Sequence, residues 1–495
     1  MTALDPREDS QPCGLVVVAS PWNFPYAIPA GGIIAALVSG NTVIFKPAPE
    51  VVLVGWELVN QLWKSGVPKQ ALHFVPTLDN EVGQKLISHQ DIDKVVLTGA
   101  YETAVKFKSW RPDLDLVAET SGKNSIIVTN SSDIDLAVYD IVKSAFGHAG
   151  QKCSAGSLAI VEKEIYNNPL FFKQLVDATN SLSVGNPVNL GNSVGPIIKD
   201  PNEKLLRALT ELEEGEEWLL KPRVLKNSNC WTPGIKINVQ PNSWTHMNEW
   251  FGPVLGIMKA PNIKKAIEWQ NATEFGLTAG LQSLSTKECN YWLKKVEAGN
   301  LYINRPITGA IVKRQPFGGW KKSSFGPTVK AGSSFYPSIF KRYDEVKDYN
   351  MLINDLKSLW NIKSKNIKND DLQSEHNYSV LHPHKKVLLV QGEKSEPGYK
   401  NYLDSIKKIF GIVIDEVEFS KLEDNDSLKA YTLVRWLSSD PVPEWIYKYN
   451  FSVDTNNIVQ NPQKELFSWV REQSVSITNH RYGNIGFSPV SIDIN

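Results

Sequence analysis

The chain has 495 residues, of which 42% are hydrophobic and 21% charged, and at roughly 100–200 residues per domain this predicts two to four domains with buried cores. Its 53 basic residues balance its 53 acidic ones, which argues against nucleic acid or an anionic membrane as the main partner. Four scattered cysteines exclude a disulfide scaffold and favour a reducing compartment. The most apolar stretch, Ile28 to Val38, is too short to span a bilayer, and the polar N-terminus lacks the apolar core of a signal peptide. We therefore expect a cytoplasmic protein.

From Gly14 onward, apolar runs of strand length alternate with segments of helical period. The run from Leu15 to Ala19 is continuously apolar, as in a parallel strand that is buried on both faces. The other expected strands are 41–45, 73–75 and 94–97, and the expected helices are 30–38, 51–64 and 81–88. Repeated strand–helix units of this length predict a doubly wound parallel sheet.

A helix from Asp133 to Phe146, with Asp133 as its N-cap, begins a second α/β body. Residues 347–377 are rich in Lys, Asn, Asp and Ser, which predicts a linker. A smaller α/β unit follows, with strands at 387–390 and 412–417, a helix at 398–410 and further helical material to the end. The expected domains are a Rossmann-like cofactor domain (1–122), a catalytic domain (123–330), a linker (331–374) and an accessory domain (375–495).

Common metal and nucleotide motifs are missing from the sequence. The eight histidines are dispersed, and the pair His382 and His384 is expected in a surface turn, so we predict no metal site. No G-x-G-x-x-G follows a strand, and the sequence contains no G-x-x-x-x-G-K-[ST] loop. A nucleotide would therefore have to bind another kind of loop.

Three polar residues in turns are candidates for chemistry. Cys153 follows a helix within a glycine-containing segment and is either a nucleophile or a small buried hydrophobic residue. Glu119 ends a short strand and is either a general base or a solvated loop acid. Asn23 stands between Pro21 and Pro25, where its amide either donates to an oxyanion or stabilises a turn. Taken alone, each of these residues leaves both interpretations open.

Several short motifs occur in an order that resembles the aldehyde dehydrogenase family. The motifs are Pro21-Trp-Asn-Phe-Pro25, Lys46-Pro-Ala48, Leu97-Thr-Gly99, Glu119-Thr-Ser-Gly-Lys123, Gly150-Gln-Lys-Cys153 and Glu249-Trp-Phe-Gly-Pro-Val254. Others, such as Gln151-Lys-Cys-Ser-Ala155 and Arg314-Gln-Pro-Phe-Gly-Gly319, resemble the branch of L-glutamate γ-semialdehyde (Δ1-pyrroline-5-carboxylate) dehydrogenases. The resemblance implies an NAD-dependent oxidation of that semialdehyde to L-glutamate in proline catabolism.

The resemblance also implies roles for individual residues. Cys153 would attack the aldehyde, Asn23 would hold the oxyanion, and Glu119 would activate the water that hydrolyses the thioester. The residues implied to bind NAD are Lys46, Gly99, Ala100, Glu249 and Phe251, and those implied to bind the substrate are Ser154, Gly309 and Ala310. Pro49 stands where many relatives have an acid, with Glu50 one place later.

The same resemblance shapes our expectations for partners. Relatives have a long portion ahead of the equivalent of Gly14, so we expect a piece of a split enzyme, a fragment or a decaying gene product. The partner would then be a proline dehydrogenase or the N-terminal portion as a separate chain, within a homo-oligomer. Alternatives are a dehydrogenase of another ω-semialdehyde and an inactive subunit that acts only in assembly. We expect the tail to dock over the second α/β body near Gly309.

Overall fold

The computed structural model describes residues 10–226, 228–327, 329–364, 367–370, 372–391 and 397–478. The chain forms two compact units. Unit 1 comprises residues 1–120, 316–367 and 380–472, and unit 2 comprises residues 121–315, 368–379 and 473–495. Both units contain sheets flanked by helices, which confirms the predicted α/β class.

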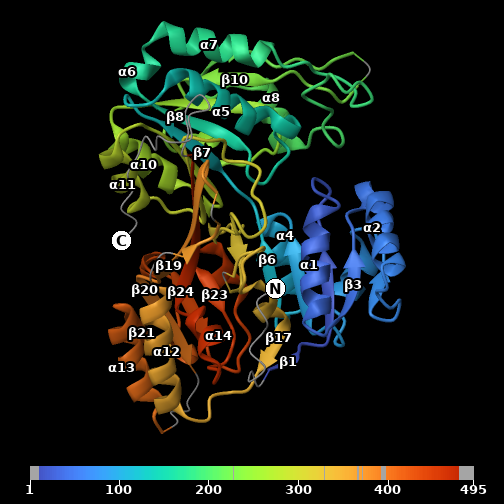
Figure 1. Ribbon diagram of the computed structural model, residues 1–495, viewed down its shortest axis with the longest axis vertical. Helices are drawn as coiled ribbons and strands as arrows, with labels where there is room; N and C mark the ends of the chain where they lie inside the picture. Colours follow the sequence, from blue (N-terminus) through green and yellow to red (C-terminus); the bar gives the residue numbers. More distant parts are fainter. Residues whose placement is uncertain are drawn as a thin grey trace. The chain divides into compact units, whose positions relative to one another are not determined.

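Unit 1 contains a six-stranded sheet of order β16-β6-β5-β2-β3-β4, in which only the β16–β6 pair is antiparallel. Its strands are β2 (Leu15–Ala19), β3 (Thr42–Lys46), β4 (Leu72–Phe74), β5 (Lys94–Thr98), β6 (Leu116–Glu119) and β16 (Ser324–Phe325). Its helices are α1 (Ala27–Val38), α2 (Val52–Lys64), α3 (Glu81–Ile87) and α4 (Tyr101–Trp110) (Figure 1). Helix α1 begins three residues earlier than expected, because Pro29 is tolerated in its first turn.

A second, four-stranded parallel sheet of unit 1 has the order β21-β20-β22-β23. Its strands are β20 (Lys386–Gln391), β21 (Val413–Glu418), β22 (Leu433–Trp436) and β23 (Ser452–Asp454), accompanied by α12 (Tyr349–Lys363), α13 (Tyr399–Phe410) and α14 (Pro462–Leu466). The two sheets share one apolar core, in which Leu389, Tyr402 and Trp469 belong to the same cluster as Val16 and Phe45. The smaller sheet is therefore not an independent domain.

Two expectations for the last third of the chain are wrong. The expected linker 331–374 contains the 15-residue helix α12, whose N-cap Asp348 accepts from the backbone N–H groups of Asn350 and Met351. Leu352 and Leu356 of this helix are buried, and Ile353, Leu359 and Trp360 pack against the same core at helical spacing, so the period was present within a segment that is polar as a whole. The expected helical ending is replaced over residues 470–478 by strand β24 (Val470–Thr478).

The pair of histidines also differs from its expected place in a surface turn. The imidazole of His384 is 2% exposed and its Nδ1 lies 3.2 Å from the Thr432 hydroxyl. Burial lowers the pKa of His384 well below its usual value. The ring of His382 packs edge-on against Trp320 at 5.6 Å. Both side chains therefore contribute to packing within unit 1.

Unit 2 is built around a sheet of order β18-β19-β24-β14-β13-β7-β8-β11-β10-β9, of which the pairs from β24 to β10 are parallel. The strands are β7 (Asn124–Val128), β8 (Gly156–Glu162), β9 (Glu217–Leu220), β10 (Gly234–Ile237), β11 (Val254–Ala260), β13 (Thr278–Gln282), β14 (Asn300–Ile303), β18 (Ile367–Lys368) and β19 (Glu375–Pro383). The main helices are α5 (Ile134–Phe146), α7 (Pro169–Asn180), α8 (Glu203–Thr210), α10 (Ile263–Ala272) and α11 (Thr286–Leu293) (Figure 1). As predicted, Asp133 caps α5, accepting from two backbone N–H groups.

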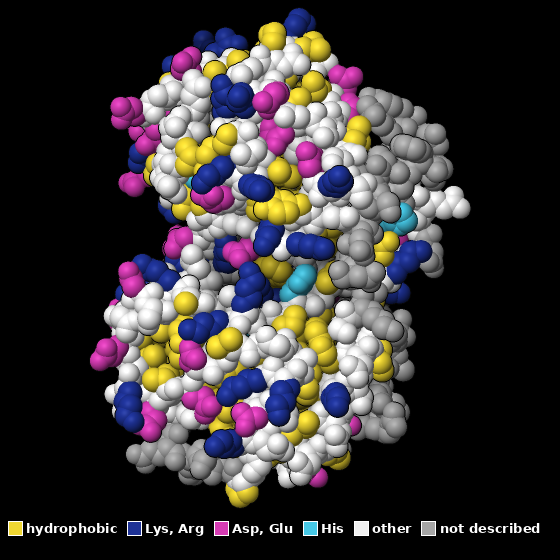
Figure 2. Space-filling view, turned by 90° about the vertical axis from the view of Figure 1, so that its left-hand side faces the viewer, with side chains coloured by type: hydrophobic (Ala, Val, Ile, Leu, Met, Phe, Trp, Pro, Cys, Tyr) yellow, Lys and Arg dark blue, Asp and Glu magenta, His cyan; other side chains and the backbone are white. Residues whose placement is uncertain are grey.

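The tail is divided between the two units. Residues 380–472 belong to unit 1, whereas the described tail residues 375–379 and 473–478 belong to unit 2, the body that carries Gly309. The rest of the expected accessory domain, 479–495, lies outside the described residues. In the part of the chain that the structure describes, no helix is long and apolar enough to cross a membrane. Figure 2 shows both acidic and basic side chains on the visible face.

Candidate active site

Five of the predicted site residues lie at one edge of the six-stranded sheet of unit 1. Asn23 follows β2, Lys46 ends β3, Gly99 and Ala100 follow β5, and Glu119 ends β6. Because these four strands are parallel neighbours, their carboxyl ends meet at the same edge. The backbone N–H of Gly99 donates to the Glu119 carbonyl at 3.1 Å, which joins two of these strand ends. In open α/β sheets, this is the edge where ligands bind.

The cation of Lys46 is held by an acid from the next loop of the same edge. Lys46 is 7% exposed, and its Nζ donates to Asp79 Oδ1 at 2.8 Å. The Asp79 side chain is 74% exposed, so its second oxygen is accessible to solvent. This edge therefore presents an ammonium group and a carboxylate side by side, a pair suited to binding hydroxyl groups.

Glu119 lines an open pocket in unit 1. Other walls of the pocket come from Gly318 and Gly319 and from the ring of Tyr336. Burial raises the pKa of Glu119 to about 8, while the nearby ammonium group of Lys330 acts in the opposite direction. Lys330 is itself 2% exposed and donates to the Gly318 carbonyl at 2.9 Å. A carboxyl group with a pKa near neutrality can act as a general base.

Cys153 lies in unit 2, in a tight turn between α5 and β8, and is half-buried. The backbone leading to the turn is kinked, because His148 and Ala149 adopt left-handed φ angles of 62° and 53°. Gly150 also has a positive φ, and a Cβ at this position would lie 2.3 Å from the Gly252 carbonyl oxygen. Strain of this kind costs about 1–3 kcal/mol per residue and is concentrated at functional sites.

Asn124, the first residue of β7, holds the backbone of this turn. Asn124 is 1% exposed, and its Nδ2 donates to the carbonyls of Cys153 and Ala155 at 2.6 and 3.0 Å. Its Oδ1 accepts from the Thr278 backbone N–H at 2.9 Å. A Cβ at Gly122 would lie 2.9 Å from the Cys153 carbonyl oxygen, so a glycine is needed for this close approach.

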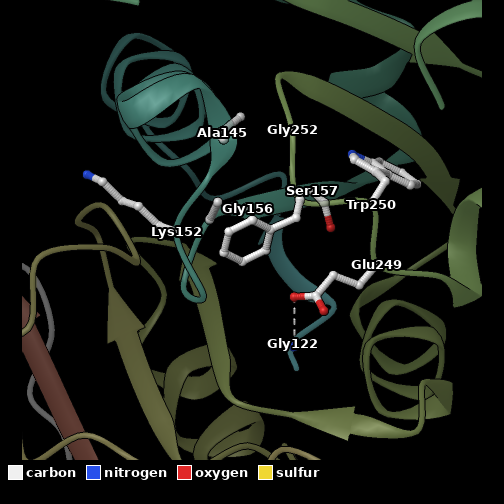
Figure 3. A pocket seen from close by; sticks show the side chains of 11 residues that line it. Gly122, Ala145, Lys152, Gly156, Ser157, Glu249, Trp250 and Gly252 are labelled. Atoms are coloured by element: carbon white, nitrogen blue, oxygen red, sulfur yellow. Dashed lines mark hydrogen bonds between the residues drawn. The ribbon is translucent and has the colours of Figure 1, made fainter. Parts of the chain in front are cut away.

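Glu249 and Phe251 lie in a loop that lines a small open pocket in unit 2 (Figure 3). Glu249 Oε1 accepts from the Gly122 backbone N–H at 2.9 Å, and Phe251 has a left-handed φ of 56°. Between them, Trp250 stacks under Lys123, whose Nζ lies 3.2 Å from the ring centroid. Lys123 Nζ has no hydrogen-bond acceptor among the residues that the structure describes, and burial lowers its pKa well below the usual value.

The three predicted substrate residues also lie in unit 2. Ser154 follows Cys153 and is only 6% exposed. Gly309 and Ala310 lie in a surface loop after β14, where Gly309 has a φ of 85° that favours glycine. The structure thus groups Asn23, Lys46, Gly99, Ala100 and Glu119 in unit 1, and Cys153, Ser154, Glu249, Phe251, Gly309 and Ala310 in unit 2.

Sequence reasoning missed three residues that support these groups. Asn124, Lys123 and Lys330 are polar and almost fully buried. For Asn124 and Lys123 a signal was present, because the polar residues 123–125 stand directly before the apolar run 126–128. Nothing in the sequence around Lys330 distinguishes it from the exposed lysines, so only the fold could reveal it.

Comparisons with known proteins relate the chain to a family. The model described as "Aldehyde dehydrogenase family" matches residues 6–346. A curated 1-pyrroline-5-carboxylate dehydrogenase from Geobacillus sp. (strain WCH70) is 37% identical over 335 residues, which are 66% of this chain and 64% of that protein. This chain therefore spans less than two thirds of the length of that relative.

Solved structures give a similar result. Proline utilization A (PutA) from Corynebacterium freiburgense has a TM-score of 0.88 and 40% identity, and the match covers 97% of this chain and 51% of that one. A 1-pyrroline-5-carboxylate dehydrogenase from Thermus with bound NAD has a TM-score of 0.63 and 33% identity, covering 67% of this chain and 65% of that one. The PutA match therefore extends over the tail, whereas the Thermus match is confined to about two thirds of the chain.

Proposed function

Because the chain belongs to the aldehyde dehydrogenase family, we propose that it oxidises L-glutamate γ-semialdehyde to L-glutamate with NAD⁺ as the electron acceptor. The names of the relatives support this substrate, and the NAD bound in the Thermus structure supports this cofactor. The observation that carries the proposal is the placement of Asn23, Lys46, Gly99 and Glu119 at the carboxyl edge of one parallel sheet. That edge suits a dinucleotide and the groups that act on a bound aldehyde.

In the proposed reaction, Cys153, Asn23 and Glu119 have separate roles. The Cys153 thiolate adds to the aldehyde carbon, forming a C–S bond, and the Asn23 amide and the Cys153 backbone N–H stabilise the resulting oxyanion. When bound, NAD⁺ supplies the acceptor for the hydride, so the carbon is oxidised by two electrons and becomes a thioester. Glu119 then takes a proton from water, which attacks the thioester carbon, breaks the C–S bond and releases L-glutamate with the thiolate restored.

The residues at the edge of unit 1 fit NAD better than NADP. Ala100 is the N-cap of the ten-residue helix α4, and the positive end of a helix favours a phosphate. Lys46 and Asp79 offer a cation and a carboxylate to the hydroxyls of a ribose. Pro49 stands where many relatives have an acid, and Asp79 would take the place of that acid in this chain. The negative charge of Asp79 would repel a 2′-phosphate, which argues for NAD.

We further propose that the chain works with a proline dehydrogenase. The PutA relatives include one described as bifunctional, and the oxidation of proline is the class of reaction that supplies this semialdehyde. The donor groups for the α-amino acid end of the substrate would be the backbone of Gly309 and Ala310 together with Ser154.

The test of this function is NADH formation by the purified chain with L-glutamate γ-semialdehyde, succinate semialdehyde and propanal. We expect kcat/KM to be highest for the first substrate, and we expect Cys153→Ala to abolish turnover with all three. A preference for succinate semialdehyde would indicate another ω-semialdehyde dehydrogenase. No turnover with any aldehyde would contradict the proposal and favour a role in assembly.

A further inference from the structure

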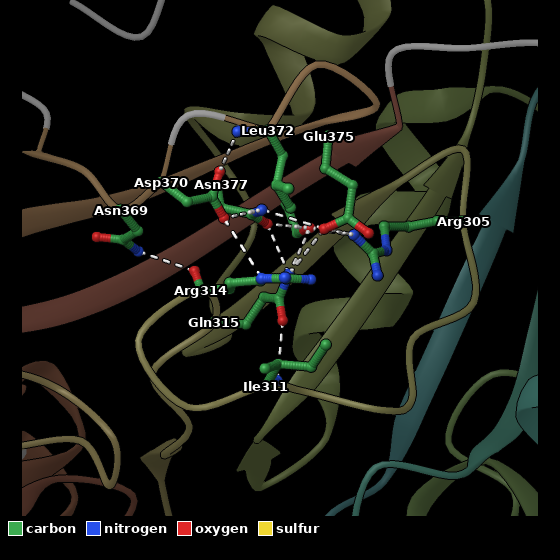
Figure 4. Close-up of polar contacts among 10 residues, drawn as sticks. Arg305, Ile311, Arg314, Gln315, Asn369, Asp370, Leu372, Glu375 and Asn377 are labelled. Atoms are coloured by element: carbon green, nitrogen blue, oxygen red, sulfur yellow. Dashed lines mark hydrogen bonds and ion pairs between the residues drawn. The ribbon is translucent and has the colours of Figure 1, made fainter. Parts of the chain in front are cut away.

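A buried polar network in unit 2 joins two segments of the tail to the loop 309–315 (Figure 4). Gln315, which is 1% exposed, lies at its centre, and its Oε1 accepts from the Ile311 backbone N–H at 2.9 Å. Its Nε2 donates to Asn377 Oδ1 at 2.7 Å and lies 3.3 Å from Ser476 Oγ. These two partners stand 62 and 161 residues further along the chain, in β19 and β24. One amide group thus connects the loop to both tail strands.

A second layer of contacts fixes the orientation of the Asn377 amide. Its Nδ2 donates to Asp370 Oδ2 at 2.8 Å and to Glu375 Oε2 at 3.1 Å. Arg305 Nη1 lies 3.0 Å from Glu375 Oε2, and this cation helps to lower the pKa of Glu375 against the effect of its burial. Because the Asn377 nitrogen faces two carboxylates, its oxygen must face Gln315. The network therefore has one stable arrangement.

The loop depends on these hydrogen bonds because it has little apolar packing. The side chains of Ile311 and Val312 are 47% and 74% exposed. The backbone turns sharply, with positive φ at Gly309 and at Lys313. Gln315 closes the turn twice, since its backbone N–H donates to the Ile311 carbonyl at 2.9 Å and its side chain accepts from the Ile311 N–H. Loss of the side-chain contact would leave the loop held by its own backbone contacts and by the Asn369 amide, whose Nδ2 donates to the Arg314 carbonyl at 2.9 Å.

We propose that Gln315 is a positioning residue, held by Asn377 and Ser476 of the tail, which sets the backbone of the loop 309–311 to receive the carboxylate end of the substrate. The identity of that ligand rests on the proposed function. The clamp, by which we mean the hydrogen bonds of the Gln315 side chain to Ile311, Asn377 and Ser476, rests on the contacts described above. Donors to a carboxylate must be held within a fraction of an ångström to discriminate substrates. The tail thereby contributes to the choice of aldehyde without any contact to it.

The test compares Gln315→Met and Asn377→Ala with the control Gln473→Met in the full chain. Gln473 is also buried on β24, but its Nε2 donates to the Ala298 carbonyl at 2.8 Å, away from the network. The two network variants should lower kcat/KM for L-glutamate γ-semialdehyde by about three- to tenfold, through KM, as expected for one or two lost hydrogen bonds. Propanal, which has no carboxylate, should change by less than about twofold in the same variants. The control should leave the ratio between the two substrates unchanged.

Amide hydrogen exchange in the peptide that contains Ile311 provides a readout that does not depend on activity. Exchange should be about tenfold faster in Gln315→Met than in the native chain or in Gln473→Met. Unchanged exchange would overturn the clamp, and so would an equal loss of kcat/KM with both aldehydes. If the native chain shows no preference for the semialdehyde, the proposed substrate is wrong, and the exchange rate alone then confirms or overturns the clamp.

Discussion

Replacing Asn124 by alanine tests whether the turn that carries Cys153 is held in place by a single side chain. The amide of Asn124 makes three buried hydrogen bonds, two to the carbonyls of Cys153 and Ala155 and one from the Thr278 N–H. A buried hydrogen bond contributes about 1 kcal/mol net, so the three together stabilise unit 2 by about 3 kcal/mol. For a unit of about 200 residues, that corresponds to a fall in Tm of roughly 6–12 °C.

The informative measurement is the reactivity of the thiol rather than the stability. Cys13, Cys230 and Cys289 are buried, and burial raises the pKa of Cys289 to about 12, so iodoacetamide at neutral pH should modify mainly Cys153. Asn124→Ala should accelerate this alkylation several-fold, because the turn opens more often.

The matched control is Asn300→Ala. Asn300 is fully buried on β14, and its Nδ2 donates to the Leu277 carbonyl at 3.1 Å. This variant should also lower Tm, but it should leave the alkylation rate of Cys153 unchanged. If both variants alter alkylation equally, or if Asn124→Ala leaves it unchanged, our assignment of Asn124 to the turn is wrong.

Two further predictions concern unit 1. Because burial raises the pKa of Glu119 to about 8, its base form is lost below that pH, so a rate limited by thioester hydrolysis should rise with pH up to about 8 and then level off. A rate that is flat between pH 6 and 9 would contradict this role, and the inflection should disappear in Glu119→Gln. Arg435 and Glu465 form a fully buried ion pair, with Arg435 Nη2 3.0 Å from Glu465 Oε2, so Glu465→Gln should lower the free energy of unfolding by about 3–5 kcal/mol. The exposed Glu444→Gln should have no measurable effect in the same denaturant titration, and equal losses in the two variants would refute the importance of the pair.

The sequence was most informative where one local interaction decides the structure. The apolar run 15–19 forms the central strand β2, and Asp133 caps α5 as predicted, because burial on both faces and a side-chain cap each leave a pattern in a few residues. The alignment of Asn23, Lys46, Gly99 and Glu119 along one edge also follows from their positions at strand ends, once the strands are parallel neighbours.

Predictions failed where distant segments determine the outcome. Helix α12 is an exception, because Leu352, Leu356 and Leu359 recur at helical spacing in the sequence and the helix was missed only because its segment is polar as a whole. The burial of His384 depends on β22 and the loop that precedes it, which no local pattern reports. Gln315 and Asn377 are 62 residues apart in the chain. Because no local pattern reports a contact over that separation, the sequence does not distinguish either residue from an amide on the surface.

The most direct test of the account is a pre-steady-state burst experiment with Glu119→Gln and an excess of L-glutamate γ-semialdehyde and NAD⁺. If Cys153 forms a thioester that Glu119 helps to hydrolyse, this variant should release a burst of about one NADH per chain, followed by a much slower steady rate. Mass spectrometry of the quenched protein should then find the glutamyl adduct on Cys153. Loss of the burst together with the steady rate, in a variant that keeps the native Tm, would contradict the assignment of Glu119 as the base for hydrolysis.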